Sequence, residues 1–324
     1  MQTANPILAE AIRGSLVESF YRGAYAIVNF EGHLVDAAGD IDRLIYGRSS
    51  LKPLQSLAIV ASGATRRYGL SLQKLALSCA SHNGEANHIY LAKKWLECLG
   101  WDEGVLECGP IWPAHSETAY SYIKNNHQPS RLYHMCSGKH LGFLSVAAHQ
   151  GITATGYTDW HHPVQIYNRD LLSEVCDIDL HQAPHGIDGC QASVIALSLR
   201  SFAKGLAQLA APQRLNMSLQ TACQEVVAAM SQYPHFVAGT ERFCTDIALQ
   251  SQGQILAKMG AEGVFSAIIP SRGWGIALKI DDGHMKAAEV ALAKVLNQHA
   301  LLYDKKFLNP AITNSNQQQV GWWQ

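Results

Sequence analysis

Strand-like segments near both ends of the chain enclose a middle that is mostly helical in pattern, and this arrangement constrains the fold most. Residues 22–40, RGAYAIVNFEGHLVDAAGD, read as two strands joined by a Glu-Gly turn. Near the other end, in GWGIALKIDDGHM, Ile276, Leu278 and Ile280 alternate with other residues and predict a strand before an Asp-Asp-Gly turn. We therefore expect one sheet built from both ends of the chain.

Apolar residues at helical spacing predict several helices between and after these strands. One begins after Pro53, where Leu54, Leu57, Ala58 and Ala61 share a face. Others are predicted at 86–100, after Lys139, and over 191–210, 219–232 and 285–302. The expected fold is mixed α/β (α+β), with a mainly antiparallel sheet, flanking helices and a helical lobe.

The length and composition indicate one compact catalytic unit over residues 1–324. Of its residues 48% are hydrophobic and 16% are charged, which suits a large buried core. We expect two lobes within this unit. The sheet lobe takes in about 1–48 and 185–324, and the helical lobe takes in about 49–184.

The charge of the chain argues against nucleic acid and membrane partners. The formal net charge is −1, and the basic residues are scattered. No apolar run approaches the ~20 residues that span a bilayer, and the first residues lack the pattern of a secretory signal. We expect a cytoplasmic location, where the eight cysteines stay mostly reduced and some are free to bind metal.

A Ser-x-x-Lys pair is the first candidate for chemistry, because a lysine can activate a serine for nucleophilic attack. The spacing occurs four times, at Ser49–Lys52, Ser71–Lys74, Ser121–Lys124 and Ser201–Lys204. In the first pair a proline follows the lysine at an expected helix start, so Ser49 and Lys52 would lie where a loop joins a helix.

Two further patterns, each present once, single out Ser49. They are Ser81-x-Asn83 in CASHNGE and Lys258-x-Gly260 in AKMGAEGVF. Penicillin-recognising serine hydrolases use Ser-x-x-Lys, Ser-x-Asn and a Lys-x-Gly motif in the same order. The order predicts that Ser49, Lys52, Ser81 and Lys258 converge in space.

The residue types in this set suit acyl transfer. A neutral lysine can accept a proton, and burial or a second cation such as Lys258 lowers a lysine pKa toward neutrality. Ser81 could relay the proton, and backbone N–H groups at the loop–helix junction could stabilise an oxyanion. The alternative is structural, with Ser49 as a helix cap, Lys52 as a solvated residue and the Asn83-Gly sequence as a turn.

Two cysteines form the second candidate site. Cys136 lies in YHMCSGKHLGF, close to Lys139 and His140, and Cys190 lies in HGIDGCQAS. Two thiolates from different loops could hold zinc. The alternatives for each cysteine are an inert buried thiol and a thiolate nucleophile at a helix start.

Taken together, the motifs resemble a known family. RSSLKP, CASHNGE, CSGKH, HPVQ, GIDGC and KMGAEGV occur in this order, over roughly residues 24–280. They resemble the signature blocks of the rhizobial-type (class 3) L-asparaginases. These enzymes are similar in fold to serine β-lactamases, serine glutaminases and other penicillin-recognising hydrolases.

The resemblance implies a role for each matching residue. Ser49 would be the nucleophile with Lys52 as its partner, and Ser81 and Lys258 would form a second couple. The other implied roles are zinc binding by Cys136, Lys139 and Cys190, and substrate recognition by Arg48, His140 and Asp188. A lysine as a zinc ligand must first lose its proton.

Two departures from the family pattern stand beside these matches. Gly47 and Arg48 occupy the start of a block expected to read Ser-Arg-Ser-Ser, and GIDGCQAS lacks a Gly-x-Pro after its cysteine. The changes affect the surroundings of the metal and the substrate, and they leave the proposed catalytic and ligand residues in place.

The resemblance implies an amidohydrolase that converts L-asparagine to L-aspartate and ammonia through an acyl-enzyme on Ser49, with an adjacent Zn²⁺ site and a homodimeric assembly. A glutaminase, another acyl-serine amidase or a β-lactam-type hydrolase is the nearest alternative. A zinc- or thiol-dependent enzyme with a structural Ser49 is the second, and a non-catalytic zinc-binding module is the third.

Overall fold

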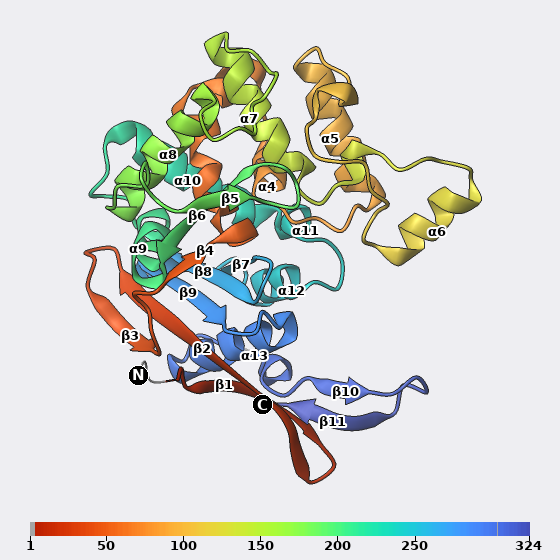
Figure 1. Ribbon diagram of the computed structural model, residues 1–324, viewed down its shortest axis with the longest axis vertical. Helices are drawn as coiled ribbons and strands as arrows, with labels where there is room; N and C mark the ends of the chain where they lie inside the picture. Colours follow the sequence, from red (N-terminus) through yellow and green to blue (C-terminus); the bar gives the residue numbers. More distant parts are fainter. Residues whose placement is uncertain (1–3, 303) are drawn as a thin grey trace.

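A long antiparallel sheet runs through the molecule (Figure 1). The computed structural model describes residues 4–302 and 304–324. The strand order is β10 (Ala311–Thr313), β11 (Gln319–Trp323), β1 (Ile7–Arg13), β2 (Leu16–Asn29), β9 (Trp274–Ile280), β8 (Val264–Ile269) and β7 (Leu256–Met259), with β3 (Leu34–Ala38) also paired to β2. Strands from both ends of the chain therefore make this sheet, and the predicted mixed α/β class with an antiparallel sheet is confirmed.

A second, smaller sheet lies beside the first. Its strands are β4 (Leu44–Tyr46), β6 (Ser193–Ser198) and β5 (His185–Ile187), all antiparallel, with β6 in the centre. β4 leads directly into the segment that carries Ser49, and β5 leads into the loop that carries Asp188 and Cys190. The small sheet therefore brings these two loops close to each other.

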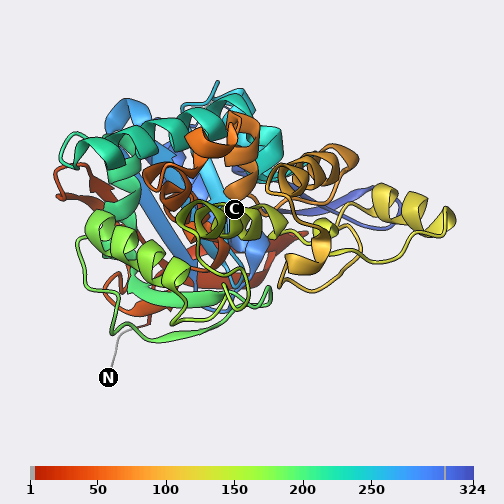
Figure 2. The ribbon, with the colours of Figure 1, turned by 90° about the horizontal axis from the view of Figure 1, so that it is seen from above.

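Helices cover both faces of the long sheet (Figure 1). On one side lie α2 (Leu57–Ala61), α4 (Leu72–Ser78), α5 (Ala86–Cys98), α7 (Ser137–Gln150), α8 (Pro163–Cys176), α9 (Leu199–Ala210) and α10 (Met217–Gln232). On the other side α13 (Met285–Gln298) packs on β1, β8 and β9. In both views α6 (Ser116–Lys124) lies at the outer edge of the molecule (Figure 2).

The alternation of side chains along each strand divides the core into two parts. In β2, Ala24 and Ala26 belong to the apolar cluster under the helical side, while Tyr25 and Ile27 belong to the cluster around α13. Successive residues of a strand point to opposite faces, so one strand lines both clusters. Small alanines on the helical side let α9 pack closely on β2 and β9.

The segment 191–210, predicted as one helix, is two elements. Ser193–Ser198 forms β6, and the helix α9 begins only at Leu199. The side chain of Ser198 accepts a hydrogen bond from the backbone N–H of Ser201, which is an N-cap and marks the true start of the helix. A short apolar run in front of a helix suits a buried strand equally well, so periodicity did not separate the two.

The remaining short elements are the helices α1 (Lys52–Gln55), α3 (Ala64–Tyr68), α11 (Pro234–Val237) and α12 (Phe243–Gln250) and the 3-10 turns η1 (Arg48–Leu51), η2 (Glu103–Val105), η3 (Arg131–Tyr133), η4 (Pro270–Arg272) and η5 (Lys305–Phe307). Among the described residues, none of the helices is both long and apolar enough to span a membrane. The division into two lobes at about residues 48 and 185 stays a prediction.

Candidate active site

Ser49 lies in the 3-10 turn η1, directly before α1, as the proline signal predicts. Its carbonyl oxygen accepts the backbone N–H of Lys52, and Pro53 follows in the first turn of α1. The Ser49 side chain is half-buried and hydrogen-bonds to no other described residue. The hydroxyl is thus held at a helix start without a protein partner that would occupy its lone pairs.

Arg48, the residue before the serine, has a left-handed backbone with φ of 49°. A non-glycine residue adopts this conformation at a cost of order 1 kcal/mol, and such residues collect at functional sites. Arg48 is the first residue of η1 and lies directly before Ser49.

Lys52, Ser81 and Lys258 form one buried hydrogen-bond network. The Ser81 Oγ lies 3.2 Å from the Lys52 Nζ and 2.9 Å from the Lys258 Nζ. Both lysines are fully buried, as is Ser81. Each amine also donates a hydrogen bond to a backbone carbonyl oxygen, Lys52 to that of Ala80 and Lys258 to that of Met259. Of the four groups that the motif order predicts to converge, these three are therefore in contact, and the Ser49 hydroxyl hydrogen-bonds to none of them.

Two backbone arrangements place these side chains. The N–H of Ser81 donates to the carbonyl oxygen of Val237 at 3.0 Å, which holds the loop after α4 in position. Lys258 lies opposite Ser266 on β8, two residues after Leu256 of the helical-side cluster. Because alternate residues of a strand share a face, Lys258 points toward the helices and not toward α13.

The neighbouring charge and the burial act together on Lys258. Burial, followed by the positive charge of Lys52, lowers the pKa of Lys258 to about 7. A buried amine without a counter-ion loses its proton more easily than one in water. A sizeable fraction of Lys258 is thus neutral at physiological pH, as a proton acceptor must be.

The three other Ser-x-x-Lys pairs are structural. Ser71 caps α4 by accepting from the N–H of Lys74. The Ser121 pair lies on α6 at the edge of the molecule, and Lys204 of the fourth pair binds Asp177 in a surface ion pair. Burial of the lysine next to a second lysine distinguishes the Ser49 pair from these.

Cys136, Lys139 and Cys190 come together next to the serine–lysine network. The Lys139 Nζ lies 3.1 Å from the Cys190 Sγ, and the Lys52 Nζ lies 3.2 Å from the Cys136 Sγ. A hydrogen bond from Cys136, assisted by the charge of Lys139, lowers the pKa of Cys190 to about 5 in spite of burial. Cys190 is therefore a thiolate at neutral pH.

The pKa of Lys139 shifts in the opposite direction to that of Lys258. Burial disfavours its charge, but the sulfurs of Cys190 and Cys136 and the carboxylate of Asp188 outweigh burial and raise the pKa of Lys139 above its ordinary value. The donor set of two cysteine sulfurs and one amine fits a borderline ion such as zinc once the Lys139 ammonium loses its proton.

Arg48 and Asp188, predicted to flank the site, pair with each other. The guanidinium Nη2 lies 2.9 Å from the Asp188 carboxylate, and both side chains are mostly buried. Burial alone would raise the pKa of Asp188, but the charges of Lys139 and Arg48 hold it below its usual value. The loop of Cys190 is thereby tied to the backbone turn of the serine.

His140 faces Tyr157, a contact that the sequence did not indicate. Its Nδ1 lies 2.6 Å from the Tyr157 hydroxyl, and its Nε2 is buried without a hydrogen-bond partner among the described residues. Burial, and then the charge of Lys139, lower the pKa of His140 to about 3, so the ring is neutral. A buried, unpaired nitrogen of this kind is ready to bond to a ligand.

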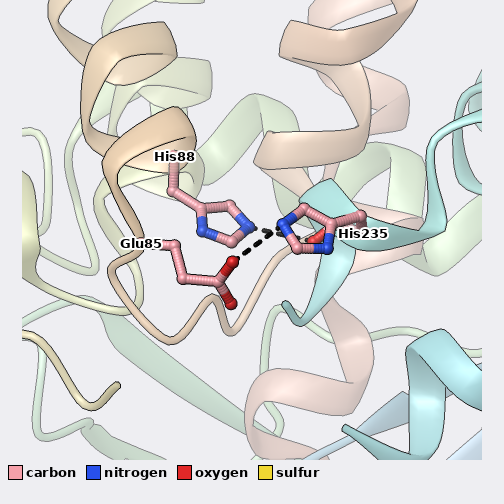
Figure 3. A group of neighbouring side chains, drawn as sticks. All are labelled: Glu85, His88 and His235. Atoms are coloured by element: carbon pink, nitrogen blue, oxygen red, sulfur yellow. Dashed lines mark hydrogen bonds and ion pairs between the residues drawn. The ribbon is translucent and has the colours of Figure 1, made fainter. Parts of the chain in front are cut away.

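A second polar group that sequence reasoning missed lies just beyond Ser81. Glu85, His88 and His235 each offer one ligand atom within 4.8 Å of the others, as a metal-binding group would (Figure 3). Glu85 and His88 stand three residues apart at the start of α5, a spacing visible in the sequence. His235 comes from α11, about 150 residues later, and nothing local links it to the other two.

The chain is distantly similar to several solved structures. A beta-lactamase from Mycobacterium bovis (Mb2281c) is 14% identical, with a TM-score of 0.45, covering 86% of this chain and 94% of that one. A class C beta lactamase from Rhodobacter sphaeroides is 12% identical, with a TM-score of 0.46 and coverages of 87% and 95%. Mglu in its native form is 14% identical, with a TM-score of 0.49 and coverages of 87% and 65%.

These TM-scores are too low to carry an argument about activity. No curated protein matches the sequence significantly. The family comparison is of a different kind, because it covers nearly the whole chain. The model of the family described as L-asparaginase II matches residues 9–324, and the chain therefore belongs to the L-asparaginase II family.

Proposed function

We propose that the protein hydrolyses the side-chain amide of L-asparagine through an acyl-enzyme on Ser49. Membership of the asparaginase family supports an amide hydrolase acting on a small molecule. The observation that carries the mechanism is the Ser81 hydroxyl between two buried lysines, one of which has a pKa near neutrality.

In the first half-reaction the Ser49 Oγ bonds to the amide carbon, and its proton passes into the amine network. Lys52 lies one helical turn after Ser49. It takes the Ser49 proton while it passes one of its own through the Ser81 hydroxyl to the neutral amine of Lys258. The C–N bond then breaks, and ammonia leaves with a proton returned from the network. In the second half-reaction water attacks the aspartyl ester, and the same groups move its proton.

The negative charge on the former amide oxygen needs hydrogen-bond donors. The first N–H groups of a helix have no partner within the helix, and Ser49 lies in such a turn. We assign its backbone N–H to this role. Gly260 supports the geometry, because a Cβ there would lie only 3.0 Å from the Ser50 nitrogen, so glycine lets β7 approach the serine turn closely.

Substrate recognition falls to the groups that flank the serine turn. The Arg48 guanidinium can bind the α-carboxylate, and the Asp188 carboxylate can bind the α-ammonium, both by charge-assisted hydrogen bonds. The unpaired Nε2 of His140 offers a third polar contact. Zinc held by Cys136, Lys139 and Cys190 would supply a Lewis-acidic centre beside the substrate.

Replacing Ser49 tests the proposal directly. We expect Ser49→Ala to release ammonia from L-asparagine at least ~10³ times more slowly than the wild type, because the nucleophile is gone. Ser121→Ala, which removes the serine of an equivalent pair on the surface, should keep full activity. Normal turnover by Ser49→Ala would refute the mechanism and favour a thiol or metal enzyme.

Glutamine is the competing substrate, since it differs from asparagine by one methylene. Such a difference is worth only ~1–3 kcal/mol in a simple pocket. We expect kcat/KM for asparagine to exceed that for glutamine. Parallel assays of ammonia release from the two amides decide between them, and a preference for glutamine would make the protein a glutaminase.

A further inference from the structure

We propose that Glu85, His88 and His235 form a second metal site, distinct from the cysteine group, for a divalent ion of the zinc type (Figure 3). Two imidazoles and one carboxylate are a common donor set for such ions. The site does not depend on the proposed asparagine hydrolysis, because none of the three residues belongs to the serine–lysine network.

In the described part of the chain, each of the two histidines has a nitrogen that no residue outside this set uses. The Nε2 of His235 is buried and lies 3.1 Å from the Glu85 Oε2, its partner in the proposed set. His88 is fully buried, and its Nδ1 also lacks a partner there. Its Nε2 lies 2.9 Å from the carbonyl oxygen of His235. Metal-binding imidazoles commonly use their second nitrogen in this way.

Glu85 is held as a carboxylate and in a fixed orientation. One of its oxygens accepts the N–H of Thr240 at 2.8 Å and the other accepts the Thr240 hydroxyl at 3.0 Å. Burial works against ionisation, but these bonds and one from Asn83 keep the pKa of Glu85 below its usual value. Supporting bonds of this kind position a metal ligand.

The neighbouring histidines are excluded as ligands by their own contacts. His82 stacks on His88, but its Nδ1 accepts the N–H of Gly84 and its Nε2 bonds to Ser137. His115 uses its Nδ1 to cap α6 and is not among the described residues whose ligand atoms converge here. The three-residue set is therefore defined by the structure, and it leaves further coordination positions for water.

The location of the site indicates what the ion would do. Glu85 and His88 begin α5, and His235 lies in α11. The same two segments are joined by backbone bonds from Ser81 to Val237 and from Asn83 to Ala238. A metal ion here would clamp the loop that carries Ser81 and stabilise the fold without touching the substrate.

Metal titration of the full chain tests this site. In a Cys190→Ser background, which weakens the cysteine group, we expect metal-free protein to bind one equivalent of Zn²⁺ by calorimetry and to gain thermal stability on binding. Adding His235→Gln should lower that affinity at least ~10-fold. Adding His181→Gln, which removes an exposed histidine paired with Asp170, should leave it unchanged.

Cobalt distinguishes the two sites even if the cysteine variant fails to fold. In the wild type we expect two equivalents of Co²⁺, of which only one produces a sulfur-to-metal absorption band. His235→Gln should remove the equivalent without that band and retain the other. The proposal is overturned if His235→Gln leaves both equivalents in place, or if the Cys190→Ser protein binds no Zn²⁺. Either result is independent of whether Ser49→Ala is inactive.

Discussion

Two lysines of this protein are both almost fully buried, yet their pKa values shift in opposite directions. Lys258 is 1% exposed and Lys139 is 5% exposed. Lys258 has another lysine as its nearest charge, and its pKa falls to about 7. Lys139 lies against sulfur and carboxylate groups, and its pKa rises above the ordinary value.

The difference shows that burial alone does not determine the pKa of a lysine. Burial disfavours the ammonium in both places, and the sign of the neighbouring charge decides the outcome. Lys258 is suited to exchange protons near neutral pH, whereas Lys139 keeps its proton until a metal ion displaces it. Lys52 links the two surroundings, because its amine contacts both the Ser81 hydroxyl, which also binds Lys258, and the Cys136 sulfur.

Replacing each lysine should have the largest effect, and the two replacements should affect kcat differently. We expect Lys258→Met to lower kcat by ~10²–10⁴, the usual contribution of a proton-transfer group. Lys139→Met should affect kcat by less than ~10-fold and act mainly on metal binding and KM. Steady-state ammonia assays measure both, with the exposed Lys94→Met as a control. If Lys139→Met lost more kcat than Lys258→Met, Lys139 and not Lys258 would be the proton-transfer group.

Replacing Cys190, the thiolate beside Lys139, tests the metal-binding role of the cysteine group. Cys190→Ser should reduce the affinity of the cysteine group for Co²⁺ at least ~10-fold, because the ligand with the lowest thiol pKa is lost. The measurement is the sulfur-to-metal band during titration. Cys98→Ser, at an exposed thiol, is the matched control. An unchanged band in Cys190→Ser would exclude this thiolate as a ligand.

The comparison also predicts how the stability of the protein changes with pH. The pKa of Lys258 is 10.5 when unfolded and about 7 when folded, and that of Cys190 is 9.0 and about 5. From about pH 7 to 9 the unfolded state therefore binds more protons at both groups, and the free energy of unfolding rises with pH. Each group contributes up to ~1.4 kcal/mol per pH unit.

Urea unfolding at a series of pH values measures this slope. Lys258→Met should be more stable than the wild type at pH 7 and should show a shallower rise toward pH 9, since the buried amine is gone. The contribution of Lys139 to the free energy of unfolding changes with pH in the opposite direction. Its raised pKa adds stability below pH 10.5, and this stability is lost at higher pH. Identical slopes for the wild type and Lys258→Met would contradict the lowered pKa.

Much of the fold and of the proposed site could be predicted from local patterns. Period-two alternation located β9, the Glu-Gly turn located the β2–β3 hairpin, and Pro53 located the helix start after Ser49. The predicted asparaginase family is confirmed by the match to residues 9–324. The catalytic, substrate and zinc roles remain proposals, although most of the residues involved are now seen to be neighbours.

What could not be predicted depends on tertiary contacts. The apolar run of β6 becomes a strand because β4 and β5 lie on its two sides, which no local pattern records. His235 reaches Glu85 only through the packing of α11 beside α5, and Tyr157 reaches His140 through the loop before α8. Contacts of this kind arise from the folded chain and leave no periodic signal.

The origin of the long sheet in both ends of the chain has a consequence for biosynthesis. Lys258 lies 177 residues beyond Ser81, and Gln324 exchanges two backbone hydrogen bonds with Glu10. A chain emerging from the ribosome exposes Ser49 and Ser81 long before β7 arrives to complete their surroundings. Under the proposed mechanism the chain becomes active only when β7 is in place. This last step joins residues of extreme sequence separation, a topology that folds slowly.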